Sequence, residues 1–176
     1  MAAHPRQNCR HGIVHCQITR ADQLKKLAQM GLHIYAQSIF LDYDIHIVRQ
    51  RVGDETASTS YSWKTLLDTG CTVSNGSDCP VETPDVMAGI QCAVTRRDLK
   101  GFGPYLPQEA FTVQEALDSF TKAGARAAFR EDSLGQIAPG YPADFVVLEE
   151  NPFAVETSSL KDIPIRMTFS NGRRVF

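Results

Sequence analysis

Two residues, His15 and Asp78, have the chemistry and the placement of metal ligands. His15 lies in an apolar strand predicted over residues 12–18, and Asp78 lies in the Gly-Ser-Asp-Cys-Pro turn that follows a strand predicted over residues 71–74. Parallel βα folds place functional residues at the carboxyl ends of their strands. Neutral imidazole and carboxylate both suit zinc, at about 2.0–2.2 Å. The carboxylate could also accept a proton from water during hydrolysis.

Both residues also have ordinary structural interpretations. A single His in an apolar strand is more often a hydrogen-bonded core residue, and an Asp after a Gly-Ser turn more often caps nearby backbone N–H groups. The remaining histidines are each expected to be structural rather than functional: His4, His11, His33 and His46. Residue type alone therefore leaves the metal hypothesis open.

The five cysteines favour neither disulfides nor thiol catalysis. Their number is odd and no two form a C-x-x-C pair, which argues against a disulfide framework and a structural zinc knuckle. Cys16 adjoins His15, but neighbouring residues of a strand point to opposite faces. Cys79 precedes a proline and has no evident base beside it. We expect reduced thiols, mostly buried.

Composition and charge exclude several classes of function. The 176 residues are 43% apolar and 22% charged with a net charge of −2, as in an ordinary soluble domain. No basic patch predicts binding to nucleic acid or an anionic membrane. No apolar stretch reaches about 18 residues, and the N-terminus has no apolar signal-peptide core. A cytoplasmic location is the resulting expectation.

The chain up to about residue 130 alternates strand and helix patterns, which is typical of a parallel α/β fold. Thr19 is the predicted N-cap of the first helix, and Gly31 is its predicted end. Residues 38–60 are polar and are expected to be irregular. The predicted strands are 12–18, 32–37 and 71–74, and the predicted helices are 21–30, 61–68, 86–96 and two segments within 112–129.

A smaller β part follows Gly135. Residues 143–148, 166–169 and 173–176 are predicted strands, and the last two form a hairpin with an Asn171-Gly172 turn. We therefore divide the chain into a βα segment, residues 1–134, and a β segment, residues 135–176.

The order of several motifs resembles one enzyme superfamily. Residues 11–17 (HGIVHCQ) resemble the sixth-strand motif of the amidohydrolase superfamily, and residues 76–82 (GSDCPVE) resemble its eighth-strand motif. Similar segments occur in the family's order at residues 61–67, 89–96, 112–117 and 135–148. The branch that matches best is amidohydrolase family 3, the formamide deformylase-like metal-dependent hydrolases, and the resemblance covers about residues 10–176.

This resemblance implies both a fold and an activity. The implied fold is α/β: the last three strands of a TIM-type (β/α) barrel, followed by a segment of a small β-sandwich. The implied reaction is hydrolysis of a non-peptide C–N bond in a small amide- or formamide-type substrate. The implied cofactor is a divalent metal, zinc in the first place, with iron or manganese as alternatives. His15 and Asp78 would bind the metal and act in catalysis, Asp78 as the general base.

The sequence also departs from the family pattern. The family's first-strand His-x-His pair, its mid-barrel lysine and its fifth-strand His have no counterparts here; Val14 replaces a common Glu, and Cys79 a frequent Trp. Three strands cannot close a barrel, and catalytic zinc normally takes three protein ligands. We therefore interpret the chain as the C-terminal part of a larger hydrolase, and we expect the isolated chain to be inactive. The alternatives are one subunit of a split hydrolase, completed by another chain, and a non-catalytic half-barrel that forms homo-oligomers.

Overall fold

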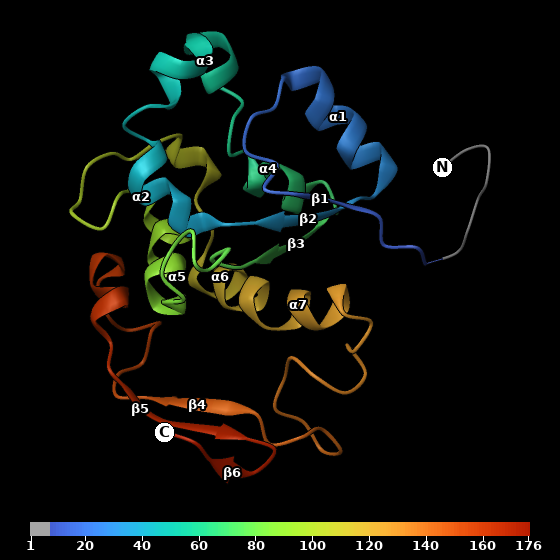
Figure 1. The fold of residues 1–176 in the computed structure, drawn as a ribbon, viewed down its shortest axis with the longest axis vertical. Helices are drawn as coiled ribbons and strands as arrows, with labels where there is room; N and C mark the ends of the chain where they lie inside the picture. Colours follow the sequence, from blue (N-terminus) through green and yellow to red (C-terminus); the bar gives the residue numbers. More distant parts are fainter. Residues whose placement is uncertain (1–7) are drawn as a thin grey trace.

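Two separate β-sheets and the helices around them make up the part of the chain that the computed structural model describes, residues 8–176. Figure 1 shows the first sheet near the middle of the molecule and the second at its C-terminal end. The first seven residues of the predicted βα segment lie outside the described part. So does His4.

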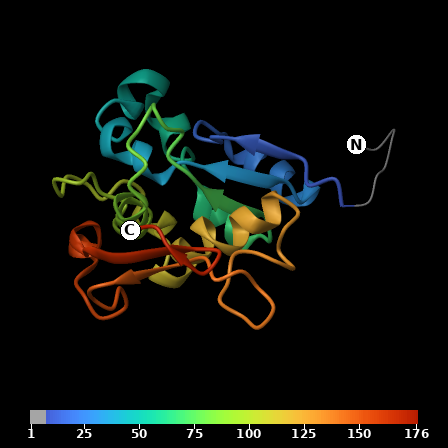
Figure 2. The same cartoon turned by 60° about the horizontal axis from the view of Figure 1, so that its bottom comes forward.

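The first sheet is parallel and has the strand order β1-β2-β3. Its strands are β1 (Gly12–Val14), β2 (His33–Ala36) and β3 (Thr72–Asn75). Because all three strands run in one direction, their carboxyl ends lie together at the same end of the sheet (Figure 2). The prediction of an α/β fold with a parallel sheet is confirmed.

Helix α1 (Ala21–Met30) connects β1 to β2 and has the predicted bounds. It ends at Gly31, whose left-handed φ of 58° suits a residue without a Cβ atom. The predicted cap was wrong by one residue. Arg20 is the N-cap, and the Thr19 hydroxyl instead donates a hydrogen bond to the carbonyl of Thr59.

The segment between β2 and β3 is helical, so the prediction of irregular structure over residues 38–60 was wrong. It contains a 3-10 helix, η1 (Ser38–Phe40), and the helices α2 (Leu41–Asp44) and α3 (Val48–Ala57). These helices are short, and Gly53 interrupts α3 with a non-helical φ of 77°. Burial of Leu41, Val48 and Ala57 stabilises them, and such tertiary packing leaves little periodicity in the sequence. Helix α4 (Trp63–Asp68) then leads into β3.

Three helices follow β3: α5 (Val86–Thr95), α6 (Val113–Phe120) and α7 (Lys122–Ala127). A 3-10 helix, η2 (Pro107–Glu109), lies between α5 and α6. The predicted capping box of α6 is present, since Thr112 and Glu115 each accept a backbone hydrogen bond from the other. The helices α6 and α7 pack against β3, at the edge opposite β1.

The second sheet is antiparallel, with strands β4 (Phe145–Leu148), β5 (Ile165–Ser170) and β6 (Arg173–Arg174). Asn171 and Gly172 form the predicted turn, both with positive φ. A 3-10 helix, η3 (Thr157–Asp162), packs against α5 and joins this part to the buried core through Leu160. Within residues 8–176, no helix combines the length and apolar character that a membrane span requires.

Candidate functional site

His15 lies just beyond the end of β1, not within the strand as predicted. Its φ is 65° and that of Cys16 is 48°, and neither angle is compatible with an extended strand. Both backbone polar groups of His15 are hydrogen-bonded in this turn. The His15 N–H donates to the Tyr35 carbonyl at 2.8 Å, and the Trp63 indole N–H donates to the His15 carbonyl at 3.0 Å. A left-handed φ in a non-glycine residue is costly and clusters at functional sites.

Asp78 follows β3 and also has a left-handed backbone, with φ 56°. Its carbonyl accepts a hydrogen bond from the Val81 N–H at 2.8 Å. Within the described residues its carboxylate caps no backbone N–H group, so the common structural role of such an aspartate does not explain it. Its side chain is 46% exposed.

The side chains of His15 and Asp78 approach each other beyond the carboxyl end of the sheet, where Nε2 of His15 lies 3.8 Å from Oδ2 of Asp78. This distance is too long for a direct hydrogen bond. An ion about 2.1 Å from each atom could contact both, because twice that length exceeds their separation. Nitrogen and oxygen donors of this kind suit zinc, iron or manganese. The pair therefore fits as two ligands of one divalent ion.

Gln37 and Phe40, which both follow β2 in the chain, hold the His15 ring. Nδ1 of His15 lies 2.9 Å from Oε1 of Gln37, the residue that follows β2. The ring also stacks on Phe40, with centroids 5.7 Å apart and an angle of 23° between the planes. Sequence analysis missed Gln37, although the rule that selected His15 and Asp78 applies equally to the end of the predicted strand 32–37.

The described residues supply no complete metal site, since no group of three His, Cys, Asp or Glu side chains gathers within residues 8–176. The carboxylate of Asp44 has other partners, because it accepts hydrogen bonds from Gln17 at 2.9 Å and Tyr61 at 2.8 Å. Burial raises the pKa of Asp44. Burial also raises the pKa of Glu82, with a further contribution from the charges of Asp42 and Asp44. A complete site would need a ligand from elsewhere.

Two of the other described histidines, His33 and His46, have structural surroundings. His33 is buried and its Nε2 lies 2.9 Å from the Ser74 hydroxyl. His46 lies 3.0 Å from Asp98 and stacks on Phe102. His11 is exposed beside the start of β1.

Cysteine chemistry finds no support at the buried thiols. Burial raises the pKa of Cys16 to about 11 and that of Cys92 to about 12, so both are protonated at neutral pH. Because the thiolate is the nucleophile, neither residue is suited to attack. Cys79 is exposed in the turn beside Asp78.

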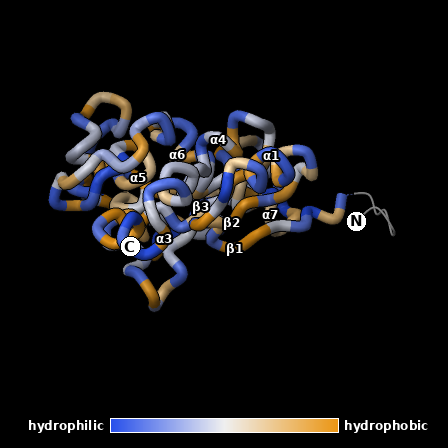
Figure 3. The backbone as a smooth tube through the Cα atoms, turned by 90° about the horizontal axis from the view of Figure 1, so that it is seen from above, coloured by the Kyte–Doolittle hydropathy of each residue, from blue (hydrophilic) through white to orange (hydrophobic). Residues whose placement is uncertain are grey.

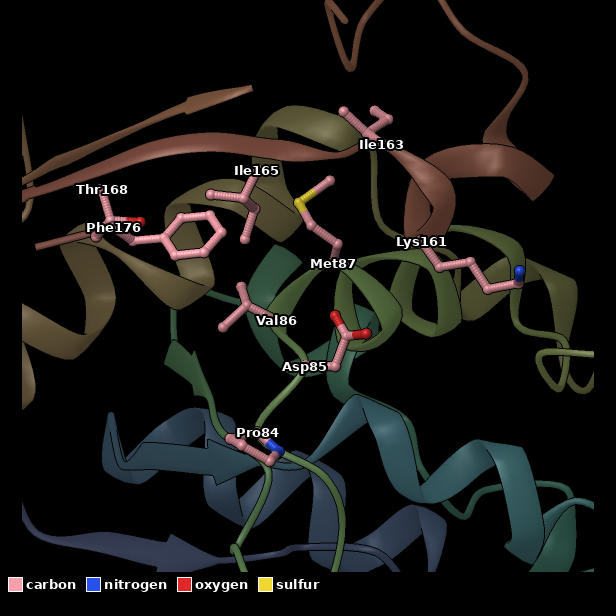
Figure 4. Close-up of a pocket in the computed structure, with 9 residues that line it drawn as sticks. All are labelled: Pro84, Asp85, Val86, Met87, Lys161, Ile163, Ile165, Thr168 and Phe176. Carbon is pink, nitrogen blue, oxygen red and sulfur yellow. The ribbon is translucent and has the colours of Figure 1, made fainter. Parts of the chain in front are cut away.

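A cavity of about 520 Å³ lies away from this pair, between the start of α5 and the second sheet. Figure 4 shows Val86, Met87, Ile165 and Phe176 around it, with Asp85 and Lys161 among the lining residues. The Asp85 carboxylate caps α5 by accepting a hydrogen bond from the Ala88 N–H. A smaller cavity of about 260 Å³ lies beside the turn before Asp78 and is lined in part by Asn75, Gly76 and Ser77.

Residues 1–176 match the amidohydrolase family throughout. The chain belongs to this family. The sequence-based assignment to amidohydrolase family 3 is thereby confirmed. The chain is 36% identical over 176 residues to YtcJ of Bacillus subtilis, whose name assigns it to the amidohydrolases. It is also 27% identical over 159 residues to an N-substituted formamide deformylase of Arthrobacter pascens.

Solved structures agree with this family assignment. An uncharacterized metal-dependent hydrolase from Pyrococcus horikoshii superimposes with a TM-score of 0.75 and 25% identity over 85% of this chain. A second one, from Pyrococcus furiosus, gives a TM-score of 0.71 and 30% identity over 82%. The chain spans about a third of its relatives' length: 33% of YtcJ, 29% of the deformylase and 31% of the Pyrococcus horikoshii chain.

Proposed function

We propose that this chain forms the sixth to eighth barrel strands of a metal-dependent amidohydrolase and supplies two ligands of its metal. The observation that carries the proposal is the 3.8 Å separation of His15 Nε2 and Asp78 Oδ2, at the ends of the two outer strands of a parallel sheet. Family membership supports this assignment, because hydrolases of this family are the chain's relatives in sequence and in structure.

The free edge of β1 supports the proposal that further strands continue the sheet. Residues Ile13 and Val14 are 37% and 58% exposed there, and the strand is seen in orange, the apolar end of the scale, in Figure 3. Unpaired N–H and C=O groups beside exposed apolar side chains are unfavourable in water. An adjacent strand would cover both, and strands β1 to β3 with residues up to 134 would then form the last part of the barrel. Residues 135–176 would belong to the small β-sandwich.

His15 and Asp78 have distinct roles in the proposed hydrolysis. When bound, a divalent ion supplies Lewis-acid polarisation of the carbonyl group under attack. Zinc is the expected ion, and iron and manganese are the alternatives. Asp78, at 46% exposure, is accessible to water and accepts the proton of the attacking water molecule at its carboxylate. It then delivers this proton to the leaving nitrogen. His15 would bind the metal ion through Nε2, the atom that faces Asp78.

The proposed substrate class is a small molecule with a non-peptide amide or formamide bond. The Arthrobacter pascens relative, named for deformylation of N-substituted formamides, supports this class. The remaining metal ligands come from a segment outside the described residues 8–176 or from a separate chain, as in a split hydrolase. The ligand set is incomplete within residues 8–176, which supports both arrangements equally.

A chimera tests the proposal directly. The third of YtcJ that matches this chain is replaced by the chain itself, and the purified chimera is assayed against a panel of N-substituted formamides and simple amides. We expect hydrolysis that disappears when either His15→Ala or Asp78→Ala is introduced. A folded chimera whose activity survives both substitutions would overturn the proposed roles. Activity only on other bond types would overturn the substrate class.

A further inference from the structure

We infer that Gln37 is the positioning residue that fixes the tautomer of His15, with the proton on Nδ1 and the lone pair of Nε2 free for a ligand. This inference deepens the proposed function, because it names the residue that prepares His15 for a metal ion. Gln37 directly follows the central strand β2, which lies between the strands that lead to His15 and Asp78.

The orientation of the Gln37 amide points to the position of the proton. Oε1 of Gln37 lies 2.9 Å from Nδ1 of His15, and a carbonyl oxygen can only accept a hydrogen bond. With Oε1 on this side of the amide, the hydrogen belongs on Nδ1. In a neutral imidazole the other nitrogen is an acceptor. Nε2 lies 3.8 Å from the Asp78 carboxylate, beyond hydrogen-bond distance, so it donates no proton there.

The surroundings of Gln37 and His15 favour the hydrogen bond between their side chains over hydrogen bonds to water. Gln37 is only 6% exposed, so water competes little for its amide. The stacking of His15 on Phe40 limits rotation of the ring away from Gln37, and the two backbone hydrogen bonds of His15 fix the backbone from which the ring extends. A hydrogen bond from the second ring nitrogen is the usual way in which a metal-binding histidine is oriented, and its loss typically weakens metal binding about 10- to 100-fold.

The tautomer can be observed without any catalytic assay. The 176-residue chain is labelled with ¹⁵N in its histidines and studied at about pH 8, above the ordinary histidine pKa of about 6.5. Two-bond ¹H–¹⁵N correlations separate protonated from unprotonated ring nitrogens, and the signals lost in His15→Asn identify His15. We expect the Nδ1–H tautomer in the unaltered chain. We expect a shift toward Nε2–H in Gln37→Leu.

A matched control is available at Gln91. This glutamine is 4% exposed, and its Oε1 accepts a hydrogen bond from the Lys161 N–H at 3.0 Å, far along the chain from His15. Gln91→Leu removes an equally buried amide and should leave the His15 tautomer unchanged. If Gln37→Leu does not fold, Gln37→Asn withdraws the acceptor with a smaller change in shape. The predominance of Nε2–H in the unaltered chain, or an unchanged tautomer in the folded Gln37 variant, would overturn the inference.

Titration with zinc alone separates this inference from the proposed function. We expect zinc to shift the His15 signals and to bind Gln37→Leu about 10-fold more weakly than Gln91→Leu. If zinc shifts His15 neither in the isolated chain nor in the YtcJ chimera, which is expected to supply the remaining ligands, while the tautomer depends on Gln37, the positioning role stands and the metal role of His15 fails. If zinc shifts His15 with equal affinity in both variants, the metal role stands and Gln37 does not prepare the ligand.

Discussion

Nε2 of His15 and Oδ2 of Asp78 lie 3.8 Å apart, although the two residues follow strands that are not neighbours in the sheet. The central strand β2 lies between these two strands, and Gln37, which follows β2, contacts His15. Three consecutive strand ends thus contribute to one small cluster, as expected of a parallel α/β sheet.

Asp78→Asn should reduce hydrolysis by the YtcJ chimera about 10²- to 10⁴-fold in kcat, because the amide cannot accept the proton that a carboxylate general base takes. The amide oxygen remains a possible ligand, so the loss of metal should be smaller than the loss of rate. The measurement is kcat and metal content on the same preparation. Asp54→Asn, in an exposed ion pair with Arg49, serves as the control and should change neither quantity.

The stability of the chain should fall in mild acid because of His33. Burial, with the positive charges of Arg126 and Arg10, lowers the pKa of His33 in the folded chain. The unfolded chain, with a histidine pKa of about 6.5, therefore binds the proton first as the pH falls. The free energy of unfolding should decrease below about pH 6.5. His33→Asn should flatten this dependence in urea titrations between about pH 7 and about pH 5. His11→Asn, an exposed control, should not.

Arg96 should be important for stability rather than for chemistry. It is 1% exposed and donates hydrogen bonds to the carbonyls of Tyr105 and Tyr61, both at 3.1 Å. Burial lowers the pKa of Arg96 to about 10, so it remains charged at neutral pH. Arg96→Met would leave both carbonyls without this donor and should lower the free energy of unfolding by about 3 kcal/mol. Exposed Arg51→Met should change it by less than about 0.5 kcal/mol in the same denaturant titration. Equal effects of the two variants would contradict this role.

The helix capping box offers a simpler check on the fold. Thr112→Ala removes the acceptor for the Glu115 N–H, which lies 3.1 Å from the hydroxyl. The expected cost is about 1 kcal/mol in the free energy of unfolding. Thr112→Ser keeps the hydroxyl and should cost clearly less; identical losses would show that the cap contributes nothing.

Local signals in the sequence were sufficient where the cause of the structure is local. The 21–30 helix is amphipathic and ends at a glycine, and the Asn171-Gly172 turn requires two positive φ angles, so both were predictable. Helices α2 and α3 depend on burial of a few side chains by distant elements, and their polar sequence gives no periodicity. The left-handed turn at His15 likewise depends on contacts with Tyr35 and Trp63.

The candidate site was predictable in part. The strand-end rule placed His15 and Asp78 at one edge of the sheet, and the structure brings them together. Their metal-binding and catalytic roles stay predictions. The same rule applied to Gln37 at the end of the predicted strand 32–37, but its specific contact with His15 depends on the parallel pairing of β1 with β2, which residue types alone do not reveal.

The most direct test of the central claim is the metal content of the YtcJ chimera, measured by elemental mass spectrometry after dialysis against metal-free buffer. If His15 and Asp78 are ligands, the folded chimera should retain zinc, iron or manganese, and the double variant His15→Ala with Asp78→Ala should lose bound metal. A double variant that folds and retains the same metal content as the unaltered chimera would contradict the assignment of both residues.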